Sequence, residues 1–146
     1  MENVYQLTHR VLLLLFYNNL KNKEIMEVQT INVKELNAQM DELVSQGRMV
    51  DAVTEFYSEN AASSDYGNVA TASKQAMIEK MEGFVEAIAK VNEITHVDTL
   101  VDGNKSASRF VFDFDMKDNS HIHWHEIIKR DWHNGKVIKE EYFNAE

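Results

Sequence analysis

Three histidines alternate with other residues in one segment, at positions 121, 123 and 125, and they suggest acid–base chemistry. An imidazole titrates near neutral pH, and burial among aromatic rings disfavours its charged form, so a buried imidazole can accept a proton. Glu140 and Tyr142 alternate in a later segment, where a carboxylate can orient an imidazole and a phenol can donate to a substrate oxygen. We therefore predict proton transfer on an apolar carbonyl compound, with the catalytic residues His123, His125, Glu140 and Tyr142.

The same residues also have explanations that involve no catalysis. A histidine among aromatic side chains can be a hydrogen-bonded core residue, and a lysine opposite Glu140, at position 129, favours a structural ion pair. The alternating histidines at 121–125 can share a metal ion, but catalytic zinc normally takes a third protein ligand, for which only Glu140 is available. We therefore expect no metal and no cofactor.

The chemistry-bearing residues lie in segments whose apolar residues alternate with period two. This alternation predicts strands over residues 93–101, 105–116, 121–132 and 136–143. Turns are expected at 102–104, at 117–120 and at Asn134-Gly135, of which Asn-Gly is the strongest short hairpin signal. The strands therefore form an antiparallel meander.

The turns fix which side chains share a face of the sheet. A two-residue turn at Asn134-Gly135 places Trp132 opposite Val137, and a similar turn at 118–119 places the phenylalanines of residues 110–114 beside the histidines. That face would line a ligand site, to which two helices add side chains; the predicted ligand-binding residues are Phe110, Phe112, Phe114, Ile127, Phe56, Tyr57 and Phe84. The opposite face would form a homodimer contact through Trp124, Ile128, Trp132, Val137 and Phe143. A one-residue bulge would exchange the two faces.

Helices precede the strands. A capping box at Asn32 and Glu35 starts a helix that runs to Gly47, a shorter helix spans residues 50–57, and a third runs from 71 or 73 to 88. The polar residues 58–68 hold a loop or a short strand. Helices followed by a meander indicate an α+β domain in which the helices cover one face of the sheet.

Residues 1–25 differ from the rest of the chain, so we divide it into an N-terminal extension, 1–25, and a single domain, 26–146. One interpretation makes Met26 the natural start. The other is an accessory helix with an apolar stripe at Leu7, Val11, Leu14 and Leu15 that packs on the domain or on a partner subunit.

The composition limits the possible partners. A formal net charge of −9 and the absence of a basic run argue against nucleic acid. The longest apolar stretch, 11–17, is far shorter than the roughly 20 residues that span a bilayer. No small-residue cleavage site follows this stretch, which favours a cytoplasmic location. The chain has no cysteine, so disulfides and thiolate chemistry are excluded.

Several segments resemble the SnoaL-like branch of the nuclear transport factor 2-like superfamily. They are Ala52-Val53-Thr54-Glu55-Phe56-Tyr57-Ser58-Glu59-Asn60, Ser73-Lys74-Gln75-Ala76-Met77-Ile78, Val101-Asp102-Gly103-Asn104, and Glu126-Ile127-Ile128 followed by 134–143. The resemblance implies a cone-shaped fold, with three helices in a strongly curved sheet, an interior pocket and usually a homodimer across the outer sheet. The superfamily includes ketosteroid isomerases, polyketide cyclases, dehydratases and binding modules. The aspartate of ketosteroid isomerases falls near Ile127, which argues against steroid isomerisation here.

Together these features predict a small-molecule pocket protein that binds an apolar or aromatic ligand and acts as an acid–base isomerase, cyclase or dehydratase. The alternative is a non-catalytic module of the same fold, which uses its pocket for ligand binding or its outer sheet for dimerisation. A third possibility is a structural dimer whose pocket is filled by Met and Phe side chains, since the chain has seven methionines.

Overall fold

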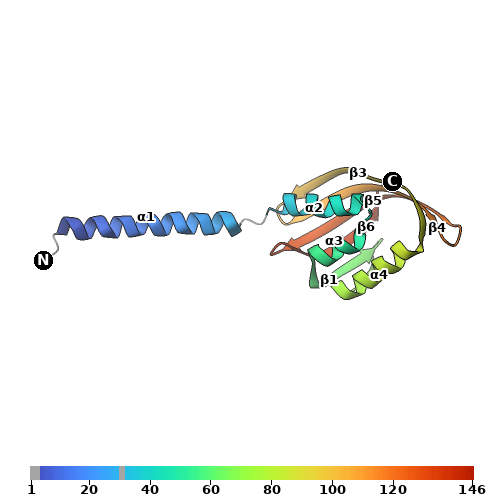
Figure 1. Cartoon of the computed structure of the whole chain (residues 1–146), viewed down its shortest axis with the longest axis horizontal. Coiled ribbons are helices and arrows are strands. Elements are labelled where there is room, and N and C mark those ends of the chain that lie inside the picture. Colours follow the sequence, from blue (N-terminus) through green and yellow to red (C-terminus); the bar gives the residue numbers. More distant parts are fainter. Residues whose placement is uncertain (1–3, 30–31) are drawn as a thin grey trace. The chain divides into compact units, whose positions relative to one another are not determined.

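The structure, a computed structural model, describes the backbone of residues 4–29 and 32–146 and the side chains of 6–21 and 32–146. It divides into two units, Met1–Ile31 and Asn32–Glu146. The first unit contains one helix, α1 (Val4–Gln29), and the second contains all the other elements (Figure 1). Each unit is described by itself.

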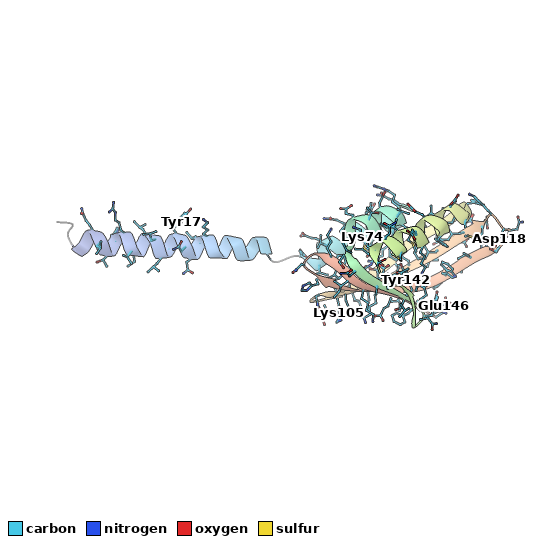
Figure 2. All side chains as sticks on the ribbon, turned by 90° about the horizontal axis from the view of Figure 1, so that it is seen from below. Tyr17, Lys74, Lys105, Asp118, Tyr142 and Glu146 are labelled. Atoms are coloured by element: carbon cyan, nitrogen blue, oxygen red, sulfur yellow. The ribbon has the colours of Figure 1, made fainter. Side chains whose placement is uncertain are left out.

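Helix α1 carries large apolar side chains on all sides. They are exposed, including Leu7, Val11, Leu14 and Leu15 of the predicted stripe. Figure 2 shows side chains such as Tyr17 projecting from this helix. None of the described helices is both long enough and apolar enough to cross a bilayer. Met26 lies within α1, and its role as a start site stays a prediction.

Three helices of the second unit begin and end within two residues of their predicted bounds. Helix α2 (Val33–Ser45) starts after Asn32, whose Oδ1 accepts a hydrogen bond from the Glu35 N–H at 3.3 Å. Helix α3 spans Met49–Phe56, and α4 spans Lys74–Ala87 after Ser73, whose Oγ accepts from the Ala76 N–H at 3.1 Å. These side-chain acceptors satisfy N–H groups that a helix start leaves unpaired.

The strands form one mixed, curled sheet. They are β1 (Tyr57–Asp65), β2 (Asn68–Thr71), β3 (Ile88–Asp102), β4 (Lys105–Met116), β5 (His121–His133) and β6 (Lys136–Asn144). Their order is β2-β1-β6-β5-β4-β3, with β1 parallel to β6 and all other pairs antiparallel. The predicted meander is confirmed, and the polar segment after α3, expected as a loop or a short strand, forms strand β1 and the turn to β2.

Helices α2, α3 and α4 lie together on the concave side of the sheet (Figure 1). Phe110, Phe112, Phe114, Ile128 and Trp132 point from the sheet into the core. The buried helix residues that meet them include Met40, Val53, Phe56 and Met77. The α+β class with helices in a curved sheet is confirmed.

The turn between β4 and β5 corrects the predicted strand register. It has three residues rather than two, because the Met116 N–H donates to the Ser120 carbonyl at 2.9 Å and Asp115 lies opposite His121. Asn119 closes the turn with φ of 68°, the left-handed conformation that a three-residue hairpin loop requires. A shift of one residue moves each side chain to the other face.

A bulge in β6 changes the predicted pairing of β5 with β6. Trp132 lies opposite Val137 as predicted, but Ile138 is an extra residue, so Asp131 pairs with Lys139 and Arg130 with Glu140. The predicted opposition of Lys129 and Glu140 is therefore wrong. Lys129 instead pairs on the outer face with Glu141, with Nζ 3.1 Å from Oε2.

Together the turn and the bulge exchange part of the two predicted faces. His123, His125 and Ile127 lie on the outer, convex face, where the sequence-based register had placed them inside. The residues predicted to form the outer dimer contact lie mainly on the inner face: Trp124, Ile128, Trp132 and Val137. Of that set, Phe143 faces outward and is 39% exposed.

Candidate functional site

A cavity of about 220 Å³ lies between the helices and the inner face of the sheet. Its apolar lining from the helices consists of Met40, Val44, Met49, Ala52, Val53, Met81 and Phe84. Its lining from the sheet is Phe112, Phe114, Trp124 and Ile128. Six polar residues complete it: Asp65, Tyr66, Lys80, Glu126, Glu140 and Tyr142. An apolar cavity with a few polar groups is typical of a site for a small organic ligand.

One wall of the cavity is aromatic. The Phe84 ring from α4 stacks on Trp124 from β5 with centroids 5.7 Å apart, and it meets Phe114 edge-on at the same distance. Phe112 continues the wall, 5.9 Å from Phe114. Such a wall suits a flat apolar or aromatic molecule.

Glu140 lies deep in the cavity and is 2% exposed. Its Oε1 accepts hydrogen bonds from the hydroxyls of Tyr57 at 2.6 Å and Tyr142 at 2.5 Å, and its Oε2 accepts from Arg130 Nε at 2.7 Å. Burial and the neighbouring Glu140 charge raise the pKa of both phenols well above the usual value, so they stay protonated donors. Glu140, Tyr57, Tyr142 and Arg130 thus hold each other in place (Tyr142 is labelled in Figure 2).

Arg130 connects this carboxylate to a second one. Its guanidinium is 1% exposed, and Nη1 donates to Asp41 Oδ1 at 2.6 Å and Asn37 Oδ1 at 2.8 Å. Burial would lower the pKa of Arg130, but attraction by Glu140 and Asp41 outweighs it, so the pKa is raised. Among the described residues, no buried side-chain nitrogen or oxygen lacks a partner. This network is therefore a satisfied internal framework.

Glu126 is a different kind of carboxylate. It is 6% exposed, lines the cavity, and receives a hydrogen bond from the Tyr66 hydroxyl to Oε1 at 2.6 Å. Burial raises the pKa of Glu126, against the lowering effect of the Tyr66 hydrogen bond. No arginine or lysine of the described residues forms a salt bridge with it, which distinguishes it from Glu140.

A charged pair borders the same cavity. Lys80 Nζ lies 2.5 Å from Asp65 Oδ2 and 5.8 Å from the centre of the Tyr142 ring. Both charged side chains are about one-third exposed, at 32% and 39%. They add a polar, partly hydrated border to an otherwise apolar cavity.

The predicted site residues divide into three groups. Those that line the cavity are Glu140, Tyr142, Phe84, Phe112 and Phe114. Those buried in the core beside it are Phe56, Tyr57 and Phe110, of which Tyr57 holds Glu140. The third group, His123, His125 and Ile127, lies on the outer face, so its predicted placement beside the phenylalanines is wrong. The cause is the three-residue turn after Met116.

Sequence reasoning missed Glu126, Tyr66, Trp124 and Arg130 as parts of the inner site. Glu126 lay in the strand segment that carried the family resemblance, and its alternation with Ile128 and Arg130 is the signal that could have found it. Among the described residues, no group of three or more His, Asp or Glu side chains is arranged around one metal position.

A family model for the SnoaL-like domain matches residues 31–144, which contain this cavity and the whole sheet. The chain belongs to the SnoaL-like family. The predicted family resemblance is thereby confirmed.

Solved structures of this SnoaL-like fold agree with that assignment. A candidate SnoaL-like polyketide cyclase from Mesorhizobium loti is 23% identical, with a TM-score of 0.69 over 77% of this chain and 98% of that one. A candidate isomerase from Rhodopseudomonas palustris is 12% identical, with a TM-score of 0.60 over 77% and 89%. TerC, co-crystallized with polyporic acid, is 7% identical, with a TM-score of 0.61 over 77% and 91%. Comparison with curated proteins gives no match.

Proposed function

We propose that this SnoaL-like domain binds a small apolar or aromatic carbonyl compound in the cavity and that Glu126 exchanges a proton with it. The observation that carries the proposal is the position of Glu126, a buried carboxyl in an apolar cavity whose pKa is raised. A raised pKa brings a carboxyl group closer to the pH range in which it can both accept and return a proton. Isomerisation, cyclisation and dehydration all use such a step.

The other polar groups support this assignment. Glu140 is engaged by Tyr57, Tyr142 and Arg130, so its role is to fix the Tyr142 oxygen at the cavity wall. Lys80 provides a positive charge that favours an oxygen on which negative charge develops. TerC, which shares the fold, was co-crystallized with polyporic acid, and this is in keeping with a small-molecule ligand in the cavity.

The first test measures binding of one- and two-ring aromatic carbonyl compounds by quenching of tryptophan fluorescence, because Trp124 lines the cavity. Ala52→Leu adds volume at the cavity wall and should weaken binding at least tenfold. The control, Ala107→Leu, changes an alanine on the outer side of β4 and should leave binding within about threefold. Equal affinities for both variants would contradict a site in this cavity.

Turnover separates catalysis from binding alone. Glu126→Gln keeps the size of the side chain and should lower kcat by roughly 100-fold, the usual contribution of a general acid or base, while binding changes little. Unchanged turnover of a substrate that binds the cavity would show that Glu126 takes no part in the reaction. A ligand that binds without turnover in the unsubstituted protein would favour the non-catalytic module.

We further propose that this domain forms a homodimer across the outer sheet in the cytoplasm. Ile127 and Phe143 lie directly opposite each other on the outward side of β5 and β6 and offer an apolar contact. The double variant Ile127→Glu with Phe143→Glu should give a monomer in light scattering, against a dimer for the unsubstituted chain. A monomer for both would contradict the dimer.

A further inference from the structure

Two histidines of the outer face direct the same ring nitrogen at each other. His123 Nε2 lies 3.1 Å from His125 Nε2, with ring centroids 5.0 Å apart and ring planes at 59°. The side chains are 49% and 36% exposed. They are on the opposite side of the sheet from the cavity, so their role is independent of the proton exchange proposed for Glu126.

The other ring nitrogens show where the protons are. His123 Nδ1 lies 3.0 Å from Asp113 Oδ2, and His125 Nδ1 lies 2.8 Å from Glu146 Oε1. An ionised carboxylate only accepts hydrogen bonds, so each Nδ1 carries the proton. Asn92 Nδ2 donates to the other oxygen of this carboxylate, Asp113 Oδ1, at 3.0 Å, which leaves Oδ2 to accept from His123.

With a proton on each Nδ1, the two neutral rings make an unfavourable contact through their Nε2 atoms. A neutral imidazole has one N–H, so when both Nδ1 atoms are protonated, both Nε2 atoms present lone pairs. Two lone pairs that face each other at 3.1 Å repel unless a proton or a metal ion lies between them. The position between His123 and His125 is therefore suited to a positive ion.

We propose that His123 and His125 bind a divalent transition-metal ion, such as Zn²⁺, Ni²⁺ or Cu²⁺, through their Nε2 atoms. At metal–nitrogen distances of about 2.0–2.1 Å, a separation of 3.1 Å corresponds to an angle of about 100° at the ion. This angle lies between those of octahedral and tetrahedral coordination. Water completes the coordination, which is why the site needs no third protein ligand.

The surroundings match those of known metal-binding histidines. A ligating histidine usually donates its second N–H to a carboxylate, which fixes the ring and raises its basicity. Asp113 and Glu146 have this position here. Asp115 adds negative charge nearby, paired with His121 at 2.9 Å, so the cluster attracts cations.

Calorimetric titration tests the site. Zinc or nickel is added at pH 7.5 to the full chain without a histidine tag, and the number of bound ions and their affinity are measured. We expect one ion per chain, with affinity reduced at least tenfold in His123→Gln and in His125→Gln. Asp113→Asn should lower the metal affinity about tenfold, the usual effect of losing a carboxylate that accepts a hydrogen bond from a ligating histidine. His121→Gln is the matched control from the same strand and should stay within about threefold.

Two further outcomes decide the proposal. Electron paramagnetic resonance of the Cu²⁺-loaded chain should show coupling to two nitrogens and lose it in the double variant His123→Gln with His125→Gln. Binding that is no tighter in the unsubstituted chain than in that double variant would overturn the site. A loss in His121→Gln as large as in His123→Gln would also overturn it, because the ion would then belong to a different set of ligands.

Discussion

The two faces of β4, β5 and β6 give carboxylates opposite properties although they alternate along the same strands. Glu126 on the inner face has its pKa raised by burial, whereas Asp113 on the outer face has its pKa lowered by hydrogen bonds from Asn92 and His123. Glu140, on the same inner face as Glu126, is ion-paired with Arg130, whereas Glu126 has no basic partner among the described residues. Burial together with the available partner, more than residue type, therefore decides what each acid can do.

Arg130 is buried and Arg109 is exposed, and replacing Arg130 should have the largest effect on the stability of the fold. Arg130→Met removes the guanidinium that pairs with both Asp41 and Glu140, which are buried. Breaking such a buried cluster by removing one partner costs about 3–5 kcal/mol in the free energy of unfolding. Urea denaturation measures this cost.

Arg109→Met is the matched control for that experiment. Arg109 is about half exposed and pairs with Asp98 on the solvent side of the sheet, Nη2 to Oδ2 at 2.6 Å. Exposed pairs contribute little because water and salt screen them. The urea midpoint should therefore not change measurably, and equal losses for Arg109→Met and Arg130→Met would contradict the inner–outer distinction.

Replacing Glu126 should have a smaller effect on stability, and this effect should depend on pH. Its raised pKa means that the folded state keeps the proton at pH values where the unfolded chain has released it, so stability falls as pH rises from the unfolded pKa through the folded one. Glu126→Gln removes this fall. The stability of the variant relative to the unsubstituted chain should thus increase across that pH interval.

Thermal unfolding from pH 4 to pH 8 measures this difference. Glu141→Gln is the control on the outer side of β6, where hydrogen bonds from Lys139 and Lys129 lower the pKa of the carboxyl. Its pH dependence has the opposite sign, because a lowered pKa stabilises the folded state above the unfolded pKa. If the stability of both variants, relative to the unsubstituted chain, changed with pH in the same direction, the raised pKa of Glu126 would be contradicted.

The elements of the fold are largely predictable from the sequence. Asn32 and Ser73 mark helix starts through their side-chain acceptors, and Asn134-Gly135 marks a hairpin, because each of these signals is local. The core phenylalanines and the Glu140–Tyr142 pair also take the predicted inward direction.

The composition of the site is less predictable, because it depends on single-residue details of register. Nothing in residues 117–119 distinguishes a two-residue from a three-residue turn by residue type alone, and Ile138 carries no mark of a bulge. The turn length and the bulge each move a whole set of side chains to the other face of the sheet. The pairing of Glu140 with Arg130 and the inward direction of Glu126 follow only once they are known.

The most direct test of this account is the pKa of Glu126, read from carboxyl-carbon chemical shifts in a nuclear magnetic resonance titration, with Glu126→Gln to assign the signal. We predict a pKa above the ordinary value of 4.5, because the side chain is buried in an apolar cavity. A pKa at or below 4.5 would mean that this carboxyl is hydrated or paired, and it would contradict the proposed proton exchange.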